Sequence, residues 1–223
     1  MNEQEIAAIV ARVVAEQLGK GGCYQAENED ALIPVGISNR HIHLSQEDFE
    51  TLFGAGATMT HFKDLSQPGQ FLSKEKVTIQ NGDRKIERVS ILGPVRKADQ
   101  VEVSKTDSVT LRAEGFIRES GDIAGTAPIE IVGPEGSIML TEGLIIAKRH
   151  IHMTPEDAEK FGVKDKDVVS VAVNTEGRKT VFGDVVVRVS PNFSLAMHID
   201  TDEANGANVP RNGCPGHIVD VQF

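Results

Sequence analysis

Two histidine pairs are the residues of this sequence best suited to chemistry. His41 and His43 form the first pair, His150 and His152 form the second, and one isoleucine separates the members of each pair. On an extended strand, residues two apart point to the same face, so each pair can bind a single ion. Imidazole is a preferred ligand of zinc and of neighbouring divalent metals. The pattern therefore predicts two metal sites, with zinc as the favoured ion.

The sequence around the pairs repeats as well, which argues against a simpler explanation. A lone histidine in a strand is usually a core or surface residue, and a single His-x-His pair would favour that reading. Here residues 38–48 match residues 147–157 at Arg, His, Ile, His, Glu and Asp, with an offset of 109 residues from His41 to His150. Chance recurrence of this string is improbable, so the repeat favours metal binding and a duplicated domain.

A second match nominates a third ligand for each pair. Residues 101–107 align with residues 197–202 once one gap is allowed, and the alignment pairs Glu102 with His198 at an offset of 96 residues. Three protein ligands leave a coordination position for a substrate, as in catalytic zinc sites. The predicted ligand sets are His41, His43 and Glu102 in the first copy and His150, His152 and His198 in the second.

Three arginines lie close to these ligands in the sequence. Gly93–Lys97 ends a predicted strand, and its Arg96 could bind a tetrahedral oxyanion near the metal through two parallel hydrogen bonds, although a solvated turn is the alternative. Arg40 and Arg149 directly precede the histidine pairs. We expect each of them to pair with a nearby acid rather than to contact a substrate.

Short strand-like runs separated by Gly, Pro, Asn and Asp dominate the chain beyond residue 32. The predicted strands are Val35–Ser38, Lys76–Gln80, Ile86–Leu92, Gln100–Ser104, Ser108–Arg112, Gly143–Ala147, Val168–Val173, Thr180–Val189 and Leu195–Ile199. This pattern is typical of small β-barrels. The repeat divides it into two β-barrel repeats, residues 33–142 and 143–223. The predicted fold class is mainly β with short helices, with two related small β-barrel domains and an N-terminal amphipathic helix.

Capping residues and turn residues mark the remaining elements. Helices are predicted at Ser45–Phe53 and Thr154–Phe161, because each begins with a capping Ser or Thr followed by acids. Asn-Gly at 81–82 and Glu-Gly at 176–177 are expected to form hairpin turns.

The first 32 residues have a different pattern. Residues 1–19 carry apolar side chains at helical spacing and predict an amphipathic helix, whereas residues 20–32 are rich in Gly and acids and predict a flexible linker. A helix of this length is marginal alone in water. Its apolar stripe is therefore expected to dock on this protein or on a partner.

Composition excludes several classes of function. The 223 residues are 39% hydrophobic and 25% charged, with a net charge of -10. That balance is ordinary for a globular protein but disfavours nucleic acid as the main partner. No apolar run is long enough to span a membrane, and the first residues lack the layout of a secretion signal, so an intracellular protein is expected. Cys23 and Cys214 lie at no metal-ligand or redox spacing.

Four long motifs give the sequence a specific resemblance. They are residues 34–45, 91–96, 147–154 and 212–216, which read PVGISNRHIHLS, ILGPVR, AKRHIHMT and NGCPG. Together they resemble the phosphate propanoyltransferases, the PduL-type phosphotransacylases. This resemblance implies a fold of two β-barrel domains with a two-zinc site and an enzyme that moves a short acyl group between coenzyme A and phosphate.

The resemblance also implies roles for single residues. The zinc ligands implied are the six that the repeat nominates, and Arg96 matches the family's phosphate-binding arginine. Ser38, Lys63, Leu92 and Asn205 match positions that line the family's coenzyme A site.

Further expectations follow from the resemblance for mechanism, partners and location. Phosphate is expected to attack the acyl carbon directly, with no side-chain nucleophile, and a homodimer is the expected assembly. Residues 1–19 resemble an encapsulation peptide that binds shell proteins, so the expected location is a bacterial microcompartment or the cytoplasm. Two alternatives remain open, a two-metal hydrolase of thioesters or phosphate esters and a non-catalytic metal-dependent assembly module.

Overall fold

The computed structural model describes residues 32–220. The predicted amphipathic helix, residues 1–19, lies outside the described residues, as does nearly all of the predicted linker. No helix in residues 32–220 has the length and apolar character that crossing a membrane requires. Strands dominate the regular structure, as the sequence predicts, and the helices are short.

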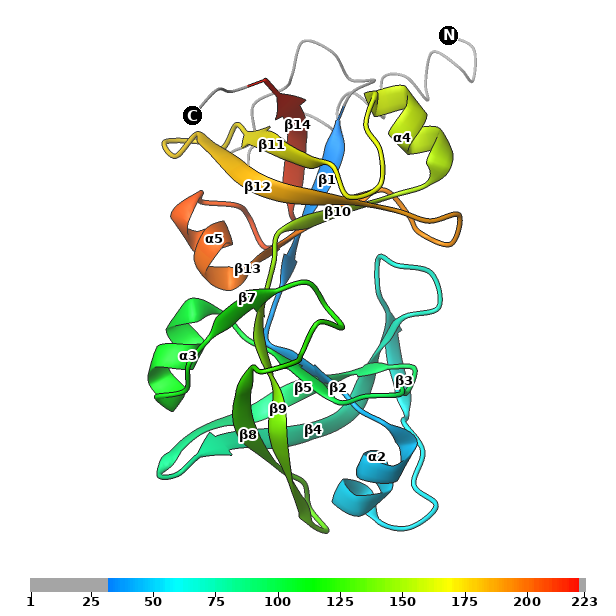
Figure 1. Ribbon diagram of the computed structural model, residues 1–223, viewed down its shortest axis with the longest axis vertical. Helices are drawn as coiled ribbons and strands as arrows, with labels where there is room; N and C mark the ends of the chain where they lie inside the picture. Colours follow the sequence, from blue (N-terminus) through cyan, green and yellow to red (C-terminus); the bar gives the residue numbers. More distant parts are fainter. Residues whose placement is uncertain (1–31, 221–223) are drawn as a thin grey trace, which may run out of the picture.

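The strands form two closed rings, which Figure 1 shows one above the other. The N-terminal barrel has the order β9-β6-β2-β5-β4-β8, and β8 closes it on β9. Two further strands pair with members of this ring, β3 with β4 and β7 with β9. The C-terminal barrel has the order β1-β13-β10-β12-β11-β14, closed between β14 and β1. Each barrel encloses its own apolar core.

The elements have the following bounds. The strands are β1 (Ile33–Ser38), β2 (His41–His43), β3 (His61–Asp64), β4 (Phe71–Asn81), β5 (Arg84–Gly93), β6 (Gln100–Glu102), β7 (Phe116–Arg118), β8 (Ala127–Val132), β9 (Ser137–Ala147), β10 (His150–Met153), β11 (Val168–Val173), β12 (Thr180–Val189), β13 (Ala196–Asp200) and β14 (Cys214–Val219). The helices are α2 (Gln46–Phe53), α3 (Lys105–Leu111), α4 (Pro155–Phe161) and α5 (Thr201–Gly206).

The two rings are copies of one topology. Going round them in the orders above, the neighbouring strands run parallel, antiparallel, parallel, and then antiparallel three times in both barrels. Irregular backbone recurs as well. Arg88 and Asp184 have left-handed φ angles of 59° and 54°, and Arg112 and Asn208 have 52° and 53°; each pair is 96 residues apart. The predicted internal repeat is therefore present in the fold, down to single backbone positions.

The barrels do not coincide with the sequence repeats, and here the predicted allotment of strands is wrong. Residues 33–38, assigned to the first barrel, form β1, which pairs with β13 and β14 of the C-terminal barrel. Residues 143–147, assigned to the second, end β9, which pairs with β6 and β8 of the N-terminal barrel. Each repeat thus gives its first strand to the other barrel. The division of the chain into units at residue 142 stays a prediction.

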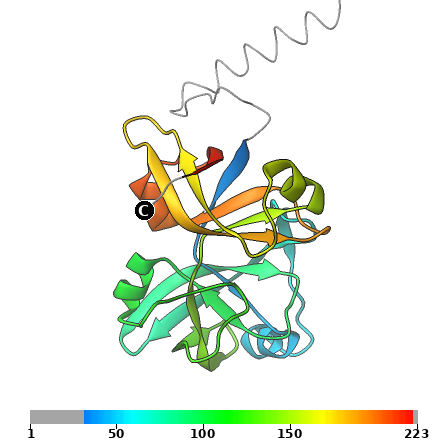
Figure 2. The ribbon, with the colours of Figure 1, turned by 45° about the horizontal axis from the view of Figure 1, so that its top comes forward.

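This exchange explains where the histidine pairs lie. The chain passes between the barrels twice, at residues 39–40 and at residues 148–149, and each crossing leads directly into a His-Ile-His strand. In Figures 1 and 2, β1 runs down from the upper barrel towards β2, and β9 runs up from the lower barrel towards β10. Both pairs are therefore brought to the junction of the two barrels.

Local signals account for most elements and for one error. Helices α2 and α4 begin at the predicted capping residues Ser45 and Thr154, and both predicted hairpin turns join adjacent strands. The predicted strand Ser108–Arg112 is wrong, because most of it lies in α3. There a capping box joins Ser104 and Asp107, and it outweighs the β-branched residues that suggested a strand.

Gly213, just before β14, is required by both its backbone angle and its surroundings. Its φ is +82°, and an added Cβ would collide with the backbone carbonyl oxygen of Val35 on β1. Gly177 has a similar φ of +74°, but nothing lies within 4 Å of the Cβ position.

These two glycines give a matched pair of stability variants. We expect Gly213→Ala to lower the free energy of unfolding by about 3 kcal/mol, because left-handed strain adds to a clash that must move β1 or β14. Gly177→Ala should cost only about 1 kcal/mol, from strain alone. Urea unfolding of both variants measures the difference, and equal losses would contradict a close approach at β1.

Candidate metal centre and active site

Strands β2 and β6 bring the first predicted ligand set together. The ladder places His41 opposite Glu102, and strand parity puts His43 on the same face. The Glu102 oxygens lie 3.4 Å from Nε2 of His41 and 3.7 Å from Nε2 of His43. Ligands of a tetrahedral zinc ion with bonds near 2.0 Å are about 3.3 Å apart. All three side chains are buried, and their spacing suits ligands of one ion.

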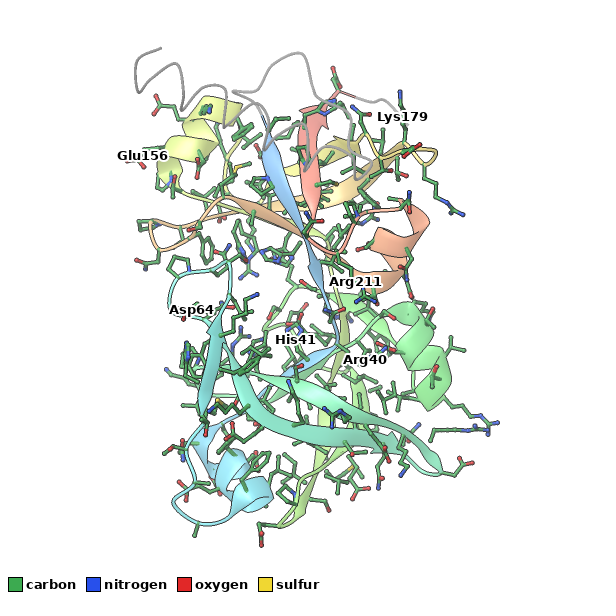
Figure 3. The ribbon with its side chains drawn as sticks, turned by 180° about the vertical axis from the view of Figure 1, so that it is seen from behind. Arg40, His41, Asp64, Glu156, Lys179 and Arg211 are labelled. Atoms are coloured by element: carbon green, nitrogen blue, oxygen red, sulfur yellow. The ribbon has the colours of Figure 1, made fainter. Side chains whose placement is uncertain are left out.

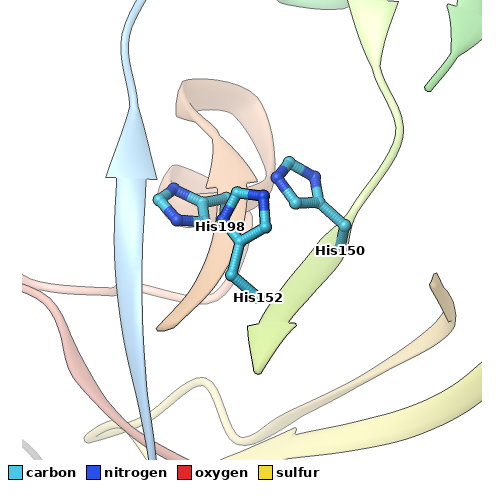
Figure 4. Close-up of side chains that lie close together, drawn as sticks. All are labelled: His150, His152 and His198. Carbon is cyan, nitrogen blue, oxygen red and sulfur yellow. The ribbon is translucent and has the colours of Figure 1, made fainter. Parts of the chain in front are cut away.

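Strands β10 and β13 repeat the arrangement in the C-terminal barrel. His150 lies opposite His198, as His41 lies opposite Glu102. The ring centres of His150 and His152 are 4.7 Å apart, and each lies 5.1 Å from that of His198. Figure 4 shows the three rings gathered where the two strands meet. In both barrels the candidate ligand atoms lie within 4.8 Å of one another.

The first histidine of each pair is held in the same way. Nδ1 of His41 lies 2.8 Å from the carbonyl oxygen of Asn39, and Nδ1 of His150 lies 2.8 Å from that of Lys148. A carbonyl can only accept, so Nδ1 carries the proton and Nε2 is left with its lone pair. Metal-binding histidines characteristically donate their second nitrogen to such a group. Both contacts come from the crossing segments, so the barrel exchange also orients the rings.

Buried nitrogens without a partner test whether these residues fit a metal. In the described part of the chain, three buried side-chain atoms lack a hydrogen-bond partner: Nδ1 of His43, Nδ1 of His152 and Nε2 of His198. Leaving such a group unpaired costs about 1–3 kcal/mol. All three belong to the two clusters, and a bound metal ion would satisfy the lone pairs of His152 Nδ1 and His198 Nε2; in His43 it is the other nitrogen, Nε2, that lies beside Glu102. The donor set, five imidazoles and one carboxylate, fits zinc.

Most of the candidate ligands also have the protonation state that a divalent ion requires. Burial, with the charge of the neighbouring histidines, lowers the pKa of His43 to about 3, of His152 to about 2 and of His198 to about 3. Burial disfavours the Glu102 carboxylate, but the adjacent His41 and His43 outweigh it and hold the pKa of Glu102 well below its usual range. At neutral pH His43, His152 and His198 therefore present neutral imidazole and Glu102 an ionised carboxylate, which bind metal without losing a proton. At His41 burial lowers the pKa, but the Glu102 carboxylate outweighs it and raises that pKa, so an ion bound there would displace a proton.

Gln100 holds the carboxylate of the first cluster, a role that sequence reasoning missed. Its Nε2 donates to Glu102 Oε1 at 2.6 Å and to Ser120 Oγ at 2.9 Å, while its Oε1 accepts from the Gly121 amide at 2.7 Å. In the other barrel, the residue opposite the second histidine is Ala196. The repeat therefore contains no signal for Gln100.

We expect Gln100→Leu to weaken metal binding at the first cluster alone. Partners of metal ligands typically contribute about 10- to 100-fold in affinity, and this change frees Glu102 while keeping the side-chain volume similar. Competition with a chromophoric chelator measures both dissociation constants. The His150 cluster serves as the internal control, and equal weakening of both sites would contradict a local effect.

Arg40 and Arg149 pair with acids, as the sequence predicts. Arg40 donates two hydrogen bonds to Asp107, at 2.8 and 2.7 Å, and Arg149 lies 3.0 Å from Glu203. Asp107 and Glu203 occupy the same capping position of α3 and α5, the helices that follow the strands carrying Glu102 and His198. Each ion pair thus links a crossing segment to the element behind the third ligand.

A single cavity of about 400 Å³ joins the two clusters. It is lined by all six candidate ligands and by Ser38, Leu92 and Arg96. Figure 3 shows His41 at the waist between the barrels, beside Arg40. The other two predicted coenzyme A contacts do not line it: Lys63 lies on the exposed strand β3, and Asn205 is exposed on α5. Arg188 lines the cavity and was not predicted.

Arg96 is the residue predicted to bind an oxyanion, and its side chain is turned towards the first cluster. Its backbone amide donates to the carbonyl oxygen of Leu44 at 2.8 Å, and its guanidinium donates to Ser120 Oγ at 3.2 Å. Ser120 in turn accepts from Gln100, which binds Glu102. The guanidinium is therefore tied to the first cluster through a chain of hydrogen bonds, and Arg96 lines the cavity.

Two linked barrels with a three-ligand cluster on each side of one cavity define a candidate two-metal enzyme. Comparison with known proteins gives the family: a family model described as phosphate propanoyltransferase matches residues 34–210. The chain is 53% identical over 184 residues to the phosphate propanoyltransferase of Thermotoga maritima, covering 82% of this chain and 88% of that protein. It is 58% identical over 178 residues to that of Lachnoclostridium phytofermentans, with coverages of 79% and 83%.

A third relative matches nearly the whole chain. It is the phosphate propanoyltransferase of Listeria monocytogenes, 45% identical over 219 residues, with 98% of this chain and 97% of that protein covered. The chain belongs to the phosphate propanoyltransferase family, as the four motifs indicated. It is accordingly an enzyme of the phosphotransacylase class.

Proposed function

We propose that this protein interconverts a short-chain acyl-CoA and phosphate with acyl phosphate and coenzyme A, with propanoyl-CoA or acetyl-CoA as the acyl donor. The observation that supports this most is one cavity lined by two three-ligand clusters and by a guanidinium bound to no acid among the described residues. Two metal sites beside an arginine that has no acidic partner suit a reaction between an anion and a carbonyl group.

The reaction needs positioning rather than a side-chain nucleophile. An oxygen of hydrogen phosphate attacks the thioester carbonyl carbon, the carbon–sulfur bond breaks, and the phosphate proton ends on the sulfur of coenzyme A. Arg96 binds the phosphate through its free N–H groups and orients an oxygen towards the carbonyl carbon. Gln100 and Ser120 join Arg96 to Glu102 through hydrogen bonds and so hold the two side chains in fixed relative positions.

Two zinc ions are the proposed cofactors, one held by His41, His43 and Glu102 and the other by His150, His152 and His198. Bound zinc would supply Lewis acidity to the thioester oxygen and stabilise the negative charge on the leaving thiolate and on phosphate.

The coenzyme A contacts are proposed from the family resemblance. Ser38 and Leu92 line the cavity, and Ser38 Oγ lies 3.4 Å from Nδ1 of His198, so it can also orient that ring. Lys63 and Asn205 lie outside the cavity, where the nucleotide end of a long substrate would extend.

Assembly and location are proposals of the same kind. We propose a homodimer, and a role for residues 1–19 as an encapsulation peptide that binds microcompartment shell proteins. Deleting residues 1–27 should leave activity intact and abolish co-purification with shells; loss of folding would contradict this role.

Thiol release from propanoyl-CoA and acetyl-CoA, with and without phosphate, tests the reaction. A transferase releases coenzyme A only with phosphate, and hydroxylamine then traps an equal amount of acyl phosphate. Thiol release without phosphate, giving the free acid, would instead identify a hydrolase. No turnover with metal bound would identify a structural metal protein.

A further inference from the structure

Arg188, near the end of β12, has no part in the reaction as described so far. It lies opposite His152 in the parallel ladder between β10 and β12, so the two side chains leave the barrel on the same face. It is half-buried and lines the same cavity as Arg96 and both ligand clusters. A second guanidinium therefore faces the space in which phosphate would bind.

The internal repeat shows that the fold does not need a cation at this position. At the 96-residue offset of the left-handed pairs, Arg188 corresponds to Leu92. The strand pairing supports this correspondence. His41 lies opposite Ser90, two residues before Leu92, and His150 lies opposite Val186, two residues before Arg188. A leucine is sufficient for packing in one copy, so the arginine in the other points to a task that uses its charge.

Within residues 32–220, neither Arg96 nor Arg188 has a carboxylate within ion-pair distance. The Arg188 guanidinium carbon lies 5.9 Å from the centre of the Phe193 ring. Glu119 is close enough to feel the charge of Arg188, but its carboxylate is bound by Lys166 at 2.6 Å. Both guanidiniums thus keep donors available.

Two unpaired cations around one cavity repel each other. Burial lowers the pKa of Arg96, the charge of Glu102 acts against this, and the nearby Arg188 lowers that pKa further. By contrast, Arg40 and Arg149, also next to the clusters, each have an acid as partner. A doubly charged anion bound between the two free guanidiniums would remove the repulsion and accept hydrogen bonds from both.

We propose that Arg188 is a second phosphate-binding residue, which together with Arg96 grips inorganic phosphate and the phosphoryl group of the acyl phosphate. The inference rests on the proposed function and deepens it, because it names the group that selects a doubly charged tetrahedral anion. The phosphates of coenzyme A share this chemistry, so the test must separate the two sources.

Steady-state kinetics of Arg188→Ala, with phosphate and acyl-CoA varied separately, provides that test. We expect the phosphate KM to rise about 10- to 100-fold, the range that a charged hydrogen bond supplies, and the acyl-CoA KM to stay within about twofold of wild type. Arg188→Lys should recover part of the loss, because it keeps the charge without the planar fork. Arg84→Ala, which removes an exposed hairpin arginine, is the matched control and should change neither constant.

Thermal unfolding with inorganic phosphate gives a readout that does not need turnover. Phosphate should raise the Tm of the wild type, and Arg188→Ala should reduce that rise without lowering the Tm in phosphate-free buffer. An unchanged phosphate KM together with an unchanged phosphate-induced Tm rise would overturn the proposal. A rise in the acyl-CoA KM alone would overturn it in favour of a coenzyme A contact. If the wild type shows no phosphate-dependent turnover, the proposed function fails, and the Tm rise still tests Arg188.

Discussion

Replacing His150 with alanine is expected to remove one metal ion per chain and to lower kcat/KM by at least about 100-fold. Loss of a residue that only hydrogen-bonds to a metal ligand costs up to about 100-fold in activity, and loss of the ligand itself should cost no less. Three imidazoles form this cluster, and two of their nitrogens are buried without a partner. Losing one of three ligands leaves a site too weak to compete with water for the ion. His41→Ala should have the same effect through the first cluster.

Metal content and stability separate this outcome from simple misfolding. The wild type should bind two zinc ions and each variant one, and added zinc should raise the Tm of each variant less than that of the wild type. His217→Ala is the control, since His217 lies on β14 outside both clusters and its loss should leave zinc content and kinetics unchanged. Full metal content in His150→Ala would contradict the assignment of the second cluster.

Replacing Arg96 with alanine is the second large effect that we expect. The phosphate KM should rise and kcat should fall, with a combined loss of about 100- to 1000-fold, the range seen when one preorganised donor to a transition-state oxyanion is removed. The physical reason is the position of Arg96, which is tied to Glu102 through Ser120 and Gln100 and cannot be replaced by a mobile surface cation.

Arg96→Lys separates charge from geometry at this position. Lysine keeps the positive charge but lacks the planar fork that binds two oxygens at once, so we expect an intermediate loss. The acyl-CoA KM should change little in both variants. Unchanged phosphate kinetics in Arg96→Ala would remove Arg96 from the site.

The candidate ligands could be predicted from the sequence because two of its patterns, strand parity and the internal repeat, correspond directly to positions in the fold. Strand parity puts His41 and His43 on one face, and the repeat pairs Glu102 with His198 without any knowledge of the fold. The first pattern is a property of contiguous residues, and the second is found by comparing two short segments of the sequence. The same holds for the capped helices at Ser45 and Thr154.

What the sequence could not supply depends on contacts between distant segments. The exchange of β1 and β9 between the barrels leaves no local pattern, because the residue pattern of a strand does not depend on which barrel the strand completes. Arg188 carried no signal either, since only the fold places it on the same cavity as Arg96 and both ligand clusters. At α3, Ser104 and Asp107 have the spacing of a capping box, and this local signal decides the structure over the β propensity of the residues that follow.

Zinc titration of metal-free protein, monitored by phosphate-dependent thiol release from propanoyl-CoA, tests the central claim most directly. We expect no release without zinc, then a rise to a plateau at about two equivalents per chain, one for each cluster. Full phosphate-dependent release from metal-free protein, or thiol release at the plateau that is independent of phosphate, would contradict a two-zinc phosphate acyltransferase.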